Sequence, residues 1–103
     1  MTIFISQPMS SKTHEEILEC QEQTTKKIKN LFGEDTVVID SYTPYTADTI
    51  DEIPEHLRLL AKAINKLADA DGAYFTKGWE KSRGCRIEHE CCKLYELEIY
   101  YEK

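Results

Sequence analysis

Short apolar runs alternate along the chain with longer amphipathic stretches. The apolar runs predict four strands, over residues 2–5, 36–39, 72–75 and 97–101. The second run is continuously apolar from Val37 to Ile39, which is typical of a strand buried on both faces. The stretches between the runs predict three helices, so the expected order of elements is βαβαβαβ.

The first helix is predicted from both of its ends. Thr13 and Glu16 have the spacing of a capping box, and Gly33 is a typical residue just past a helix C-terminus. Thr24 and Thr25 weaken the middle of its apolar face. The predicted apolar face consists of Ile17, Ile28, Leu31 and Phe32.

The second helix has the clearest periodicity, and the third is short. Apolar residues recur every three or four positions in the second, at Ile53, Leu57, Leu60, Ile64 and Leu67. The third is predicted to begin at about Ser82 or Gly84 and to end at Leu94. Between the second strand and the second helix, residues 40–51 predict a loop longer than most connections, and long loops in small domains are often functional.

Alternating strands and helices predict one α/β domain over residues 1–103. We expect a small doubly wound fold of the flavodoxin or Rossmann type, with a parallel four-stranded sheet and helices on both faces. Ligands of such sheets bind outside the carboxyl ends of the strands. This predicts that the loops at residues 6–12, 40–51 and 76–88 form one binding site.

The net charge and the length of the chain restrict which ligands and partners we expect. The 103-residue chain has a net charge of −6, which disfavours duplex DNA or RNA as a ligand. No apolar run approaches the roughly 20 residues that cross a membrane, and no signal peptide is recognised, so we expect a cytoplasmic protein without membrane contact and with four reduced cysteines. A domain this small buries little surface, which favours a homodimer or higher homo-oligomer.

The candidate chemistry lies in residues 82–90, which follow a strand and open a helix. Backbone N–H groups at a helix N-terminus, with Ser82 and a turn at Gly84, suit an anion such as phosphate. Glu88 is the candidate carboxylate on this helix, although a glutamate near a helix N-terminus is more often a surface charge. The second candidate acid is Asp71, directly before the third strand, with Asp69 as the alternative.

Three motifs together resemble the nucleoside 2-deoxyribosyltransferase superfamily. They are Phe4-Ile5-Ser6-x-Pro8-Met9, Ala70-Asp71-Gly72-Ala73 and Trp79-x-x-Ser82-x-Gly84-x-x-x-Glu88. The resemblance covers nearly the whole chain, in the right order. It is strongest to a short phage- and bacteria-associated branch, related to the hydrolases of deoxynucleoside 5′-monophosphates.

The resemblance implies an enzyme that cleaves or transfers N-glycosidic bonds. Glu88 would be the nucleophile and Asp71 the assisting acid. Ser82, with Gly84, would contact a substrate phosphate. The loop of Ser6, Gln7, Pro8 and Met9 would line the pocket. Cleavage of an N-glycosidic bond passes through an oxocarbenium-like transition state, which a nearby carboxylate can stabilise.

The aromatic and thiol side chains add further expectations. Trp79 and Tyr42, with Tyr45 as an alternative, are candidates for stacking on a base. Cys85, His89 and Cys92 share a helix face, but without a fourth ligand the cysteines are better explained as core residues than as metal ligands. His89 is expected to be a polar neighbour of Glu88 or a surface residue. We therefore expect no metal and no cofactor.

Two departures from the superfamily leave other functions open. Gln7 replaces a common glycine, and the chain ends just after its last strand, where longer members contribute a residue to a neighbouring subunit's site. A protein that binds a nucleotide without cleaving it is the first alternative. A structural domain with a vestigial pocket is the second.

Overall fold

The structure is a computed structural model, and it describes residues 1–9, 12–42 and 55–103. Within these residues four strands and three α-helices alternate, with one short 3₁₀ helix before the last α-helix. In chain order the elements are β1 (Thr2–Ser6), α1 (His14–Phe32), β2 (Val37–Asp40), α2 (Glu55–Leu67), β3 (Gly72–Phe75), η2 (Trp79–Lys81), α3 (Arg83–Leu94) and β4 (Glu98–Tyr101).

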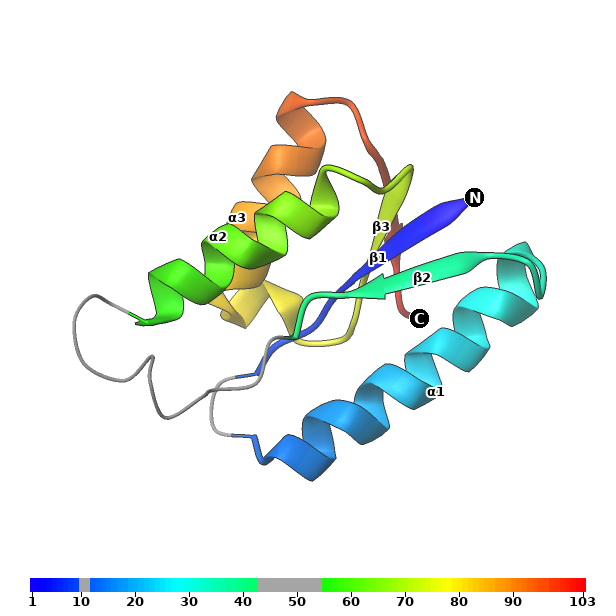
Figure 1. Cartoon of the computed structure of the whole chain (residues 1–103), viewed down its shortest axis with the longest axis horizontal. Coiled ribbons are helices and arrows are strands. Elements are labelled where there is room, and N and C mark those ends of the chain that lie inside the picture. The colour runs from blue at the N-terminus through cyan, green and yellow to red at the C-terminus, as the bar shows by residue number, and fades with distance from the viewer. Residues whose placement is uncertain (10–11, 43–54) are drawn as a thin grey trace.

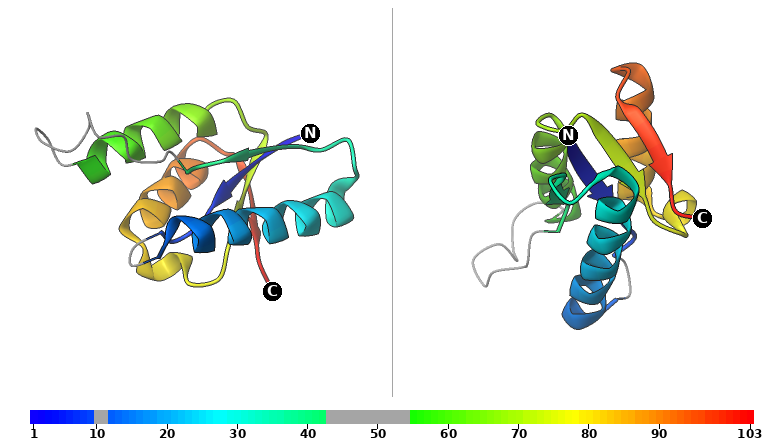
Figure 2. Two further views of the ribbon diagram at one scale, coloured as in Figure 1. Left: turned by 60° about the horizontal axis from the view of Figure 1, so that its bottom comes forward. Right: turned by 90° about the vertical axis from the view of Figure 1, so that its right-hand side faces the viewer.

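The strands form one parallel sheet in the order β2-β1-β3-β4. Helix α1 covers one face of the sheet, and α2 and α3 lie together on the other (Figures 1 and 2). The predicted doubly wound α/β fold is therefore confirmed. Because all strands are parallel, the loops that follow them emerge at one edge, which we call the carboxyl edge.

Side-chain alternation along β1 fills two apolar layers. Ile3 and Ile5 point toward α1 and pack with Ile28. Phe4 points the other way and packs with Leu67 of α2 and Cys92 of α3, among others. Ile3, Phe4 and Ile5 are fully buried, so β1 is closely packed on both faces up to the residue that ends it.

The ends of α1 are those that the sequence predicts, but its buried face differs. Thr13 and Glu16 form both bonds of the capping box, and Gly33 follows the helix with φ 114°, a value that favours glycine. Leu31, predicted on the apolar face, is 66% exposed, whereas Thr24 is buried. The face toward the sheet thus carries a threonine in its middle, where the sequence pattern suggested a weak point.

The prediction that residues 36–39 form a strand buried on both faces is wrong. The strand runs from Val37 to Asp40, and Val37 is 56% exposed. Among the described strands β2 lies at one end of the sheet, with β1 as its neighbour on one side only. A run of β-branched residues has the same sequence pattern in either position, because edge location depends on strand order and not on local hydrophobicity.

The remaining boundaries differ slightly from prediction. Helix α3 begins at Arg83 with Ser82 as its N-cap, which decides between the two predicted starts. Helix η2 was not predicted, and β4 begins one residue later than expected. Ile53, Tyr45 and most of the predicted loop at residues 40–51 lie outside the described residues. No helix in the described part of the chain has the length and hydrophobicity to cross a membrane.

Candidate functional site

A buried serine–glutamate pair lies at the carboxyl edge of the two central strands. Ser6 is the last residue of β1 and pairs in register with Phe75 at the end of β3. Its side chain points to the same face as Phe4, toward α2 and α3. Glu88 lies on the buried face of α3, together with Cys85 and Cys92. The Ser6 hydroxyl donates a hydrogen bond of 2.5 Å to Glu88 Oε1.

The environment of Glu88 is unusual for a glutamate. Its side chain is only 4% exposed, and burial raises the pKa of Glu88 from its ordinary value of 4.5 to about 7. The hydrogen bond from Ser6 favours the carboxylate and lowers the pKa, but less than burial raises it. Glu88 is therefore a carboxyl group that gains or loses its proton near neutral pH. Such groups are often functional.

Cys85 and Ser82 complete the surroundings of this pair. Ser82 caps α3, and its hydroxyl accepts a hydrogen bond from the backbone N–H of Cys85 at 3.3 Å. The Cys85 thiol is buried, which raises its pKa, while side-chain hydrogen bonds with Ser6 and Ser82 oppose this rise. Ser6 and Ser82 thus meet around one thiol, beside Glu88. The pattern of the sequence paired Ser82 with Glu88 but gave no sign that Cys85 joins them.

The loop after β1 lies beside the loop after β3. The backbone N–H of Thr76 donates to the carbonyl of Ser6 at 3.0 Å. A methyl group placed on Gly78 would lie 3.8 Å from the ring of Pro8. Pro8 and Met9 are half-buried. These two loops form the rim of the site next to Ser6.

Gln7 is turned toward α1 and away from Glu88. Its side-chain N–H group donates to the carbonyl of Ile17 at 3.4 Å, and its amide oxygen is buried without a hydrogen-bond partner among the described residues. The side chain therefore fills the space under the first turns of α1.

Tyr42 also lies at the carboxyl edge, held in place by α1. Its hydroxyl and Nδ1 of His14 are hydrogen-bonded at 2.7 Å, and the two rings are tilted against each other. The backbone N–H of Tyr42 donates to the carboxylate of Asp40. His14 is a partner that the sequence pattern did not single out, because nothing in the chain links a helix start to a loop 28 residues later.

Trp79 belongs to an aromatic cluster at the ends of β3 and β4. It stacks on His89 with ring centroids 4.2 Å apart and also packs against Phe75 and Tyr101. Nε2 of His89 and the hydroxyl of Tyr101 lie within hydrogen-bond distance, at 2.6 Å. Trp79 therefore anchors η2 and α3 to the end of the sheet, and one of its faces is occupied by His89.

The structure does not bring Asp71 to Glu88. Asp71 precedes β3, and its carboxylate accepts a hydrogen bond from the backbone N–H of Thr2 at 2.8 Å, at the amino ends of the strands. Ser6 lies four residues further along β1, which corresponds to roughly 13 Å. Asp69, the alternative, lies in the turn before Asp71, at the same end of the sheet. Topology explains this, because a residue that precedes a parallel strand lies at the edge opposite to the carboxyl ends.

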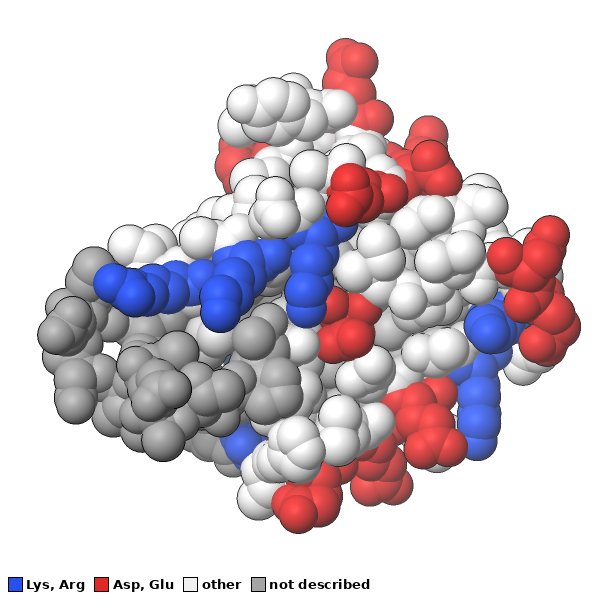
Figure 3. All heavy atoms as spheres, in the orientation of Figure 1, with Lys and Arg blue, Asp and Glu red and all other residues white. Residues whose placement is uncertain are grey.

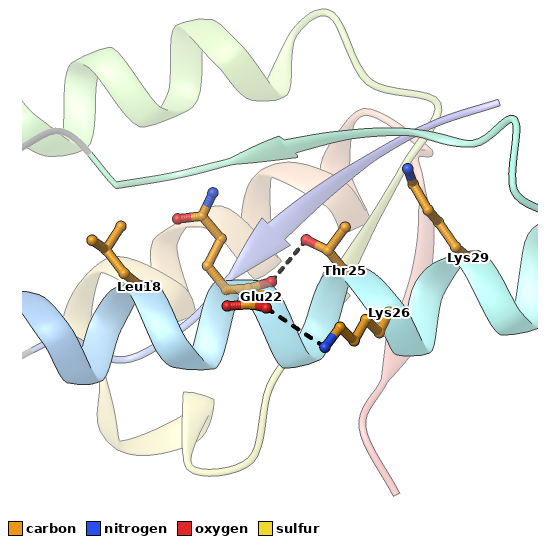
Figure 4. Close-up of a pocket in the computed structure, with 6 residues that line it drawn as sticks. Leu18, Glu22, Thr25, Lys26 and Lys29 are labelled. Carbon is orange, nitrogen blue, oxygen red and sulfur yellow. Dashed lines mark hydrogen bonds and ion pairs between the residues drawn. The ribbon is translucent and has the colours of Figure 1, made fainter.

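Two shallow surface hollows lie away from the serine–glutamate pair. One runs along α1 and is drawn in Figure 4, where Glu22 and Lys26 form an ion pair of 3.5 Å and Thr25 donates to the carbonyl of Gln21. The other lies on the outward face of α3, between Arg83 and Leu94. Glu22, Thr25 and Lys26 bond within their own helix, so this hollow is a feature of the helix surface and gives no evidence of a ligand.

A model of one protein family matches residues 1–101, and its description is "Domain of unknown function (DUF4406)". The chain belongs to the DUF4406 family. No curated protein matches the chain, and no solved structure does either. The family assignment thus covers almost the whole domain and leaves its chemistry to be inferred from the site.

Two cysteines of α3 are core residues, whereas His89 is half-buried. Cys85 and Cys92 are buried, and His89, one turn after Cys85, stacks on Trp79. Within the described ranges no three histidine, cysteine, aspartate or glutamate side chains are arranged to hold a metal ion.

Proposed function

We propose that this member of the DUF4406 family cleaves or transfers the N-glycosidic bond of a nucleoside or nucleotide, with Glu88 as the nucleophile. The observation that carries the proposal is the buried Glu88 carboxyl, hydrogen-bonded to Ser6 at the carboxyl edge of β1 and β3. This is the edge at which parallel α/β sheets bind ligands. The resemblance of Ser82-x-Gly84-x-x-x-Glu88 to nucleoside 2-deoxyribosyltransferases supports the same role.

The pair is suited to attack on a sugar carbon. Ser6 holds Oε1 of Glu88, and within the described residues no hydrogen bond reaches Oε2. In the proposed reaction Oε2 bonds to the anomeric carbon, the bond to the base breaks, and the base leaves with the electron pair and takes a proton from water. Water then hydrolyses the glycosyl ester, or a second base accepts the sugar. Asp71 has no part in this scheme, because it lies at the opposite edge.

The remaining predicted residues have supporting roles in the proposal. Ser82, Gly84 and the first N–H groups of α3 would face a phosphate or sugar hydroxyl. Pro8 and Met9 would form the rim beside them. Tyr42 would offer a ring face at the end of β2. We assign no base contact to Trp79, since His89 occupies one of its faces.

A nucleotide-binding protein without catalysis is the second candidate. It is favoured by the position of Asp71, which leaves Glu88 without the second acid that the superfamily uses. In that case a protonated Glu88 would serve as a hydrogen-bond donor to the ligand, which a pKa of about 7 permits at neutral pH.

The test is base release from a panel of deoxynucleosides and their 5′-monophosphates, followed by chromatography. We expect release by the wild-type protein, with a rate that rises with pH and reaches half of its maximum near pH 7, because attack requires the ionised carboxylate. Glu88→Gln should abolish release. Glu19→Gln, which alters an exposed glutamate on α1, should leave it unchanged.

The outcomes separate the two candidates. Release that persists in Glu88→Gln contradicts the assignment of the nucleophile. Absence of release, together with a rise in melting temperature on addition of an intact nucleotide, supports the binding protein. Absence of both effects contradicts each candidate.

The proposal includes a homodimer. The outward face of α3 exposes Ile87 and Leu94, and Arg86 and Glu90 lie on the same face with opposite charges. A second copy running antiparallel about a two-fold axis would cover the apolar residues and pair these charges. Sedimentation should show a dimer for the wild type and a monomer for Leu94→Arg. A monomeric wild type would contradict this part of the proposal.

A further inference from the structure

The serine–glutamate pair shares its buried position with the thiol of Cys85. Figure 3 shows charged side chains spread over the surface of the molecule, whereas Glu88 is 4% exposed, Cys85 is 2% exposed and Ser6 is fully buried. Cys85 precedes Glu88 by three residues, so the two side chains lie on the same face of α3. Polar groups at this depth need partners inside the protein, which makes the direction of each hydrogen bond important.

The single hydrogen of the Ser6 hydroxyl decides how the serine and the thiol interact. A hydroxyl can donate one hydrogen bond and accept two. Ser6 donates its hydrogen to Oε1 of Glu88 at 2.5 Å. Its side chain is also hydrogen-bonded to the Cys85 thiol. Because the hydrogen of Ser6 points at Glu88, the S–H group of Cys85 is the donor in this second contact and the Ser6 oxygen is the acceptor.

Ser82 supplies the thiol with a donor in turn. The Ser82 oxygen accepts a hydrogen bond from the backbone N–H of Cys85, which leaves the Ser82 hydroxyl hydrogen free to point at the sulfur. Burial raises the pKa of the Cys85 thiol, so the thiol keeps its proton at neutral pH and remains a donor. The donors therefore follow one direction, from Ser82 through Cys85 and Ser6 to Glu88.

The backbone of Ser6 is already held by other contacts. Its carbonyl oxygen accepts a hydrogen bond from the backbone N–H of Thr76 at 3.0 Å. Rotation of the Ser6 side chain is thus the freedom that its polar neighbours control. A hydrogen bond that is itself part of a chain of donors is strengthened by the bond before it. The donation from Cys85 should therefore strengthen the bond from Ser6 to Glu88.

We propose that Cys85 is a positioning residue, whose S–H group donates to Ser6 and thereby directs the Ser6 hydroxyl at Oε1 of Glu88. This leaves Oε2 to attack the sugar, and the thiol itself touches no substrate. The inference rests on the proposed function for the role of Glu88, and it adds the group that orients the nucleophile.

The route from Cys85 to Glu88 runs through Ser6. Among the described residues, the charged groups that act on the thiol are Glu88 and Lys12, which lies in the loop after β1. Cys92 lies on the other side of Glu88, one turn further along α3. Burial and the hydrogen bond from Ser6 together set the pKa of Glu88 in this part of the chain. A change at Cys85 is therefore expected to reach Glu88 by weakening the bond from Ser6.

The experiment compares the pH profile of base release in three cysteine variants. Cys85→Ala should move the pH of half-maximal release upward by roughly 0.5, which makes release about threefold slower at pH 6. Cys85→Ser retains a donor and should restore the wild-type profile. The matched control is Cys92→Ala, which removes the same atoms from the same face of α3, next to the apolar cluster around Phe4, and should leave the midpoint unchanged. A ¹³C titration of the Glu88 carboxyl should give the same order without any substrate.

A second measurement does not depend on the alanine variants being folded. Infrared difference spectra of the wild type against Cys85→Ser, and against Cys92→Ser, isolate the S–H stretching bands of the two thiols. The Cys85 band should lie at lower frequency, because donation to an oxygen weakens the S–H bond, whereas Cys92 packs in an apolar cluster.

The outcomes distinguish this inference from the function on which it rests. An unchanged midpoint in Cys85→Ala, equal shifts in Cys85→Ala and Cys92→Ala, or a Cys85 band no lower than that of Cys92 overturns the positioning role. Base release that Glu88→Gln abolishes, with the same pH profile in Cys85→Ala as in the wild type, supports the proposed function and overturns this inference. A shift of the Glu88 titration that Cys85→Ser reverses, without base release from any nucleotide, supports the positioning role and contradicts the proposed function.

Discussion

Glu88 is held in the core at a cost that depends on pH. Its pKa in the folded protein, about 7, lies above the value of 4.5 in an unfolded chain. The folded state therefore binds more protons between these values, and stability falls as pH rises from about 4.5 to about 7. Above pH 7 the loss is constant, at about 3 kcal/mol. An acid retained at such a cost is consistent with a role in function.

Glu88→Gln removes this penalty, so we expect a more stable protein at neutral and alkaline pH. Glutamine retains a carbonyl oxygen that accepts the hydrogen bond from Ser6. The free energy of unfolding should exceed that of the wild type by about 3 kcal/mol at pH 8 and by about 1 kcal/mol at pH 5. Urea unfolding at the two pH values measures the difference. An equal effect at both would show that Glu88 titrates normally.

Ser6→Ala should raise the pKa of Glu88 further above its ordinary value. The hydrogen bond from Ser6 lowers the pKa of Glu88, so its loss raises that pKa further above 7. Stability should fall by about 1–2 kcal/mol at pH 8 and by less at pH 5, where the carboxyl is protonated. A ¹³C titration of the glutamate carboxyl carbons measures the pKa directly. Ser41→Ala, at another buried serine, serves as the control, and an unchanged pKa in Ser6→Ala would contradict the pairing.

The residues of this site were predictable to different degrees. Ser6, Ser82 and Glu88 follow from their places beside strand ends and a helix start. The contact between Ser6 and Glu88 does not, because it joins residues 82 positions apart and depends on how α3 rotates against the sheet. The position of Asp71 away from Glu88 could have been predicted from the sequence. In a parallel sheet the ligand binds at the carboxyl ends of the strands, and a residue that precedes a strand lies at the opposite edge.

At the scale of elements, local signals predict ends better than faces. The capping box and Gly33 bound α1 as expected, because each acts through bonds to its own helix. The buried Thr24 and the exposed Leu31 depend on where the sheet meets the helix, which local spacing does not determine. The edge position of β2 could not be predicted from local spacing either. Strand order is a property of the crossovers and leaves a run of β-branched residues unchanged.

Loss of the α1 cap should therefore have a local and predictable effect. Thr13→Ala removes the oxygen that accepts a hydrogen bond from the backbone N–H of Glu16. We expect stability to fall by about 1 kcal/mol and the melting temperature by roughly 4–8 °C. Calorimetry of Thr13→Ala against Thr13→Ser, which retains the cap, isolates the hydrogen bond. Equal melting temperatures would show that the cap contributes nothing.

At the scale of the whole molecule, Glu102 joins α1 and the loop after β3 to the end of the chain beyond β4. Its carboxylate accepts a hydrogen bond from Lys27 at 2.5 Å and another from the backbone N–H of Lys77 at 2.9 Å. Burial raises the pKa of Glu102, but these bonds outweigh it, and the resulting pKa is lowered. The stabilisation is therefore present above the ordinary pKa of a glutamate and is lost as pH falls through the lowered value.

The two glutamates should then give opposite pH dependences in one protein. Glu102→Gln should lower the melting temperature by roughly 2–5 °C at pH 7, a small effect because Lys27 is largely exposed. The difference should disappear in acid, where Glu102 is protonated, and shrink in high salt. Glu88→Gln should raise the melting temperature at pH 7, and its effect should also vanish in acid. Glu19→Gln, on the exposed surface of α1, provides the baseline. Glu88 and Glu102 share no hydrogen-bond partner in the part of the chain that the structure describes, so their effects should add in the double variant. A deviation beyond about 0.5 kcal/mol would show that the carboxyl edge and the end of the chain are coupled.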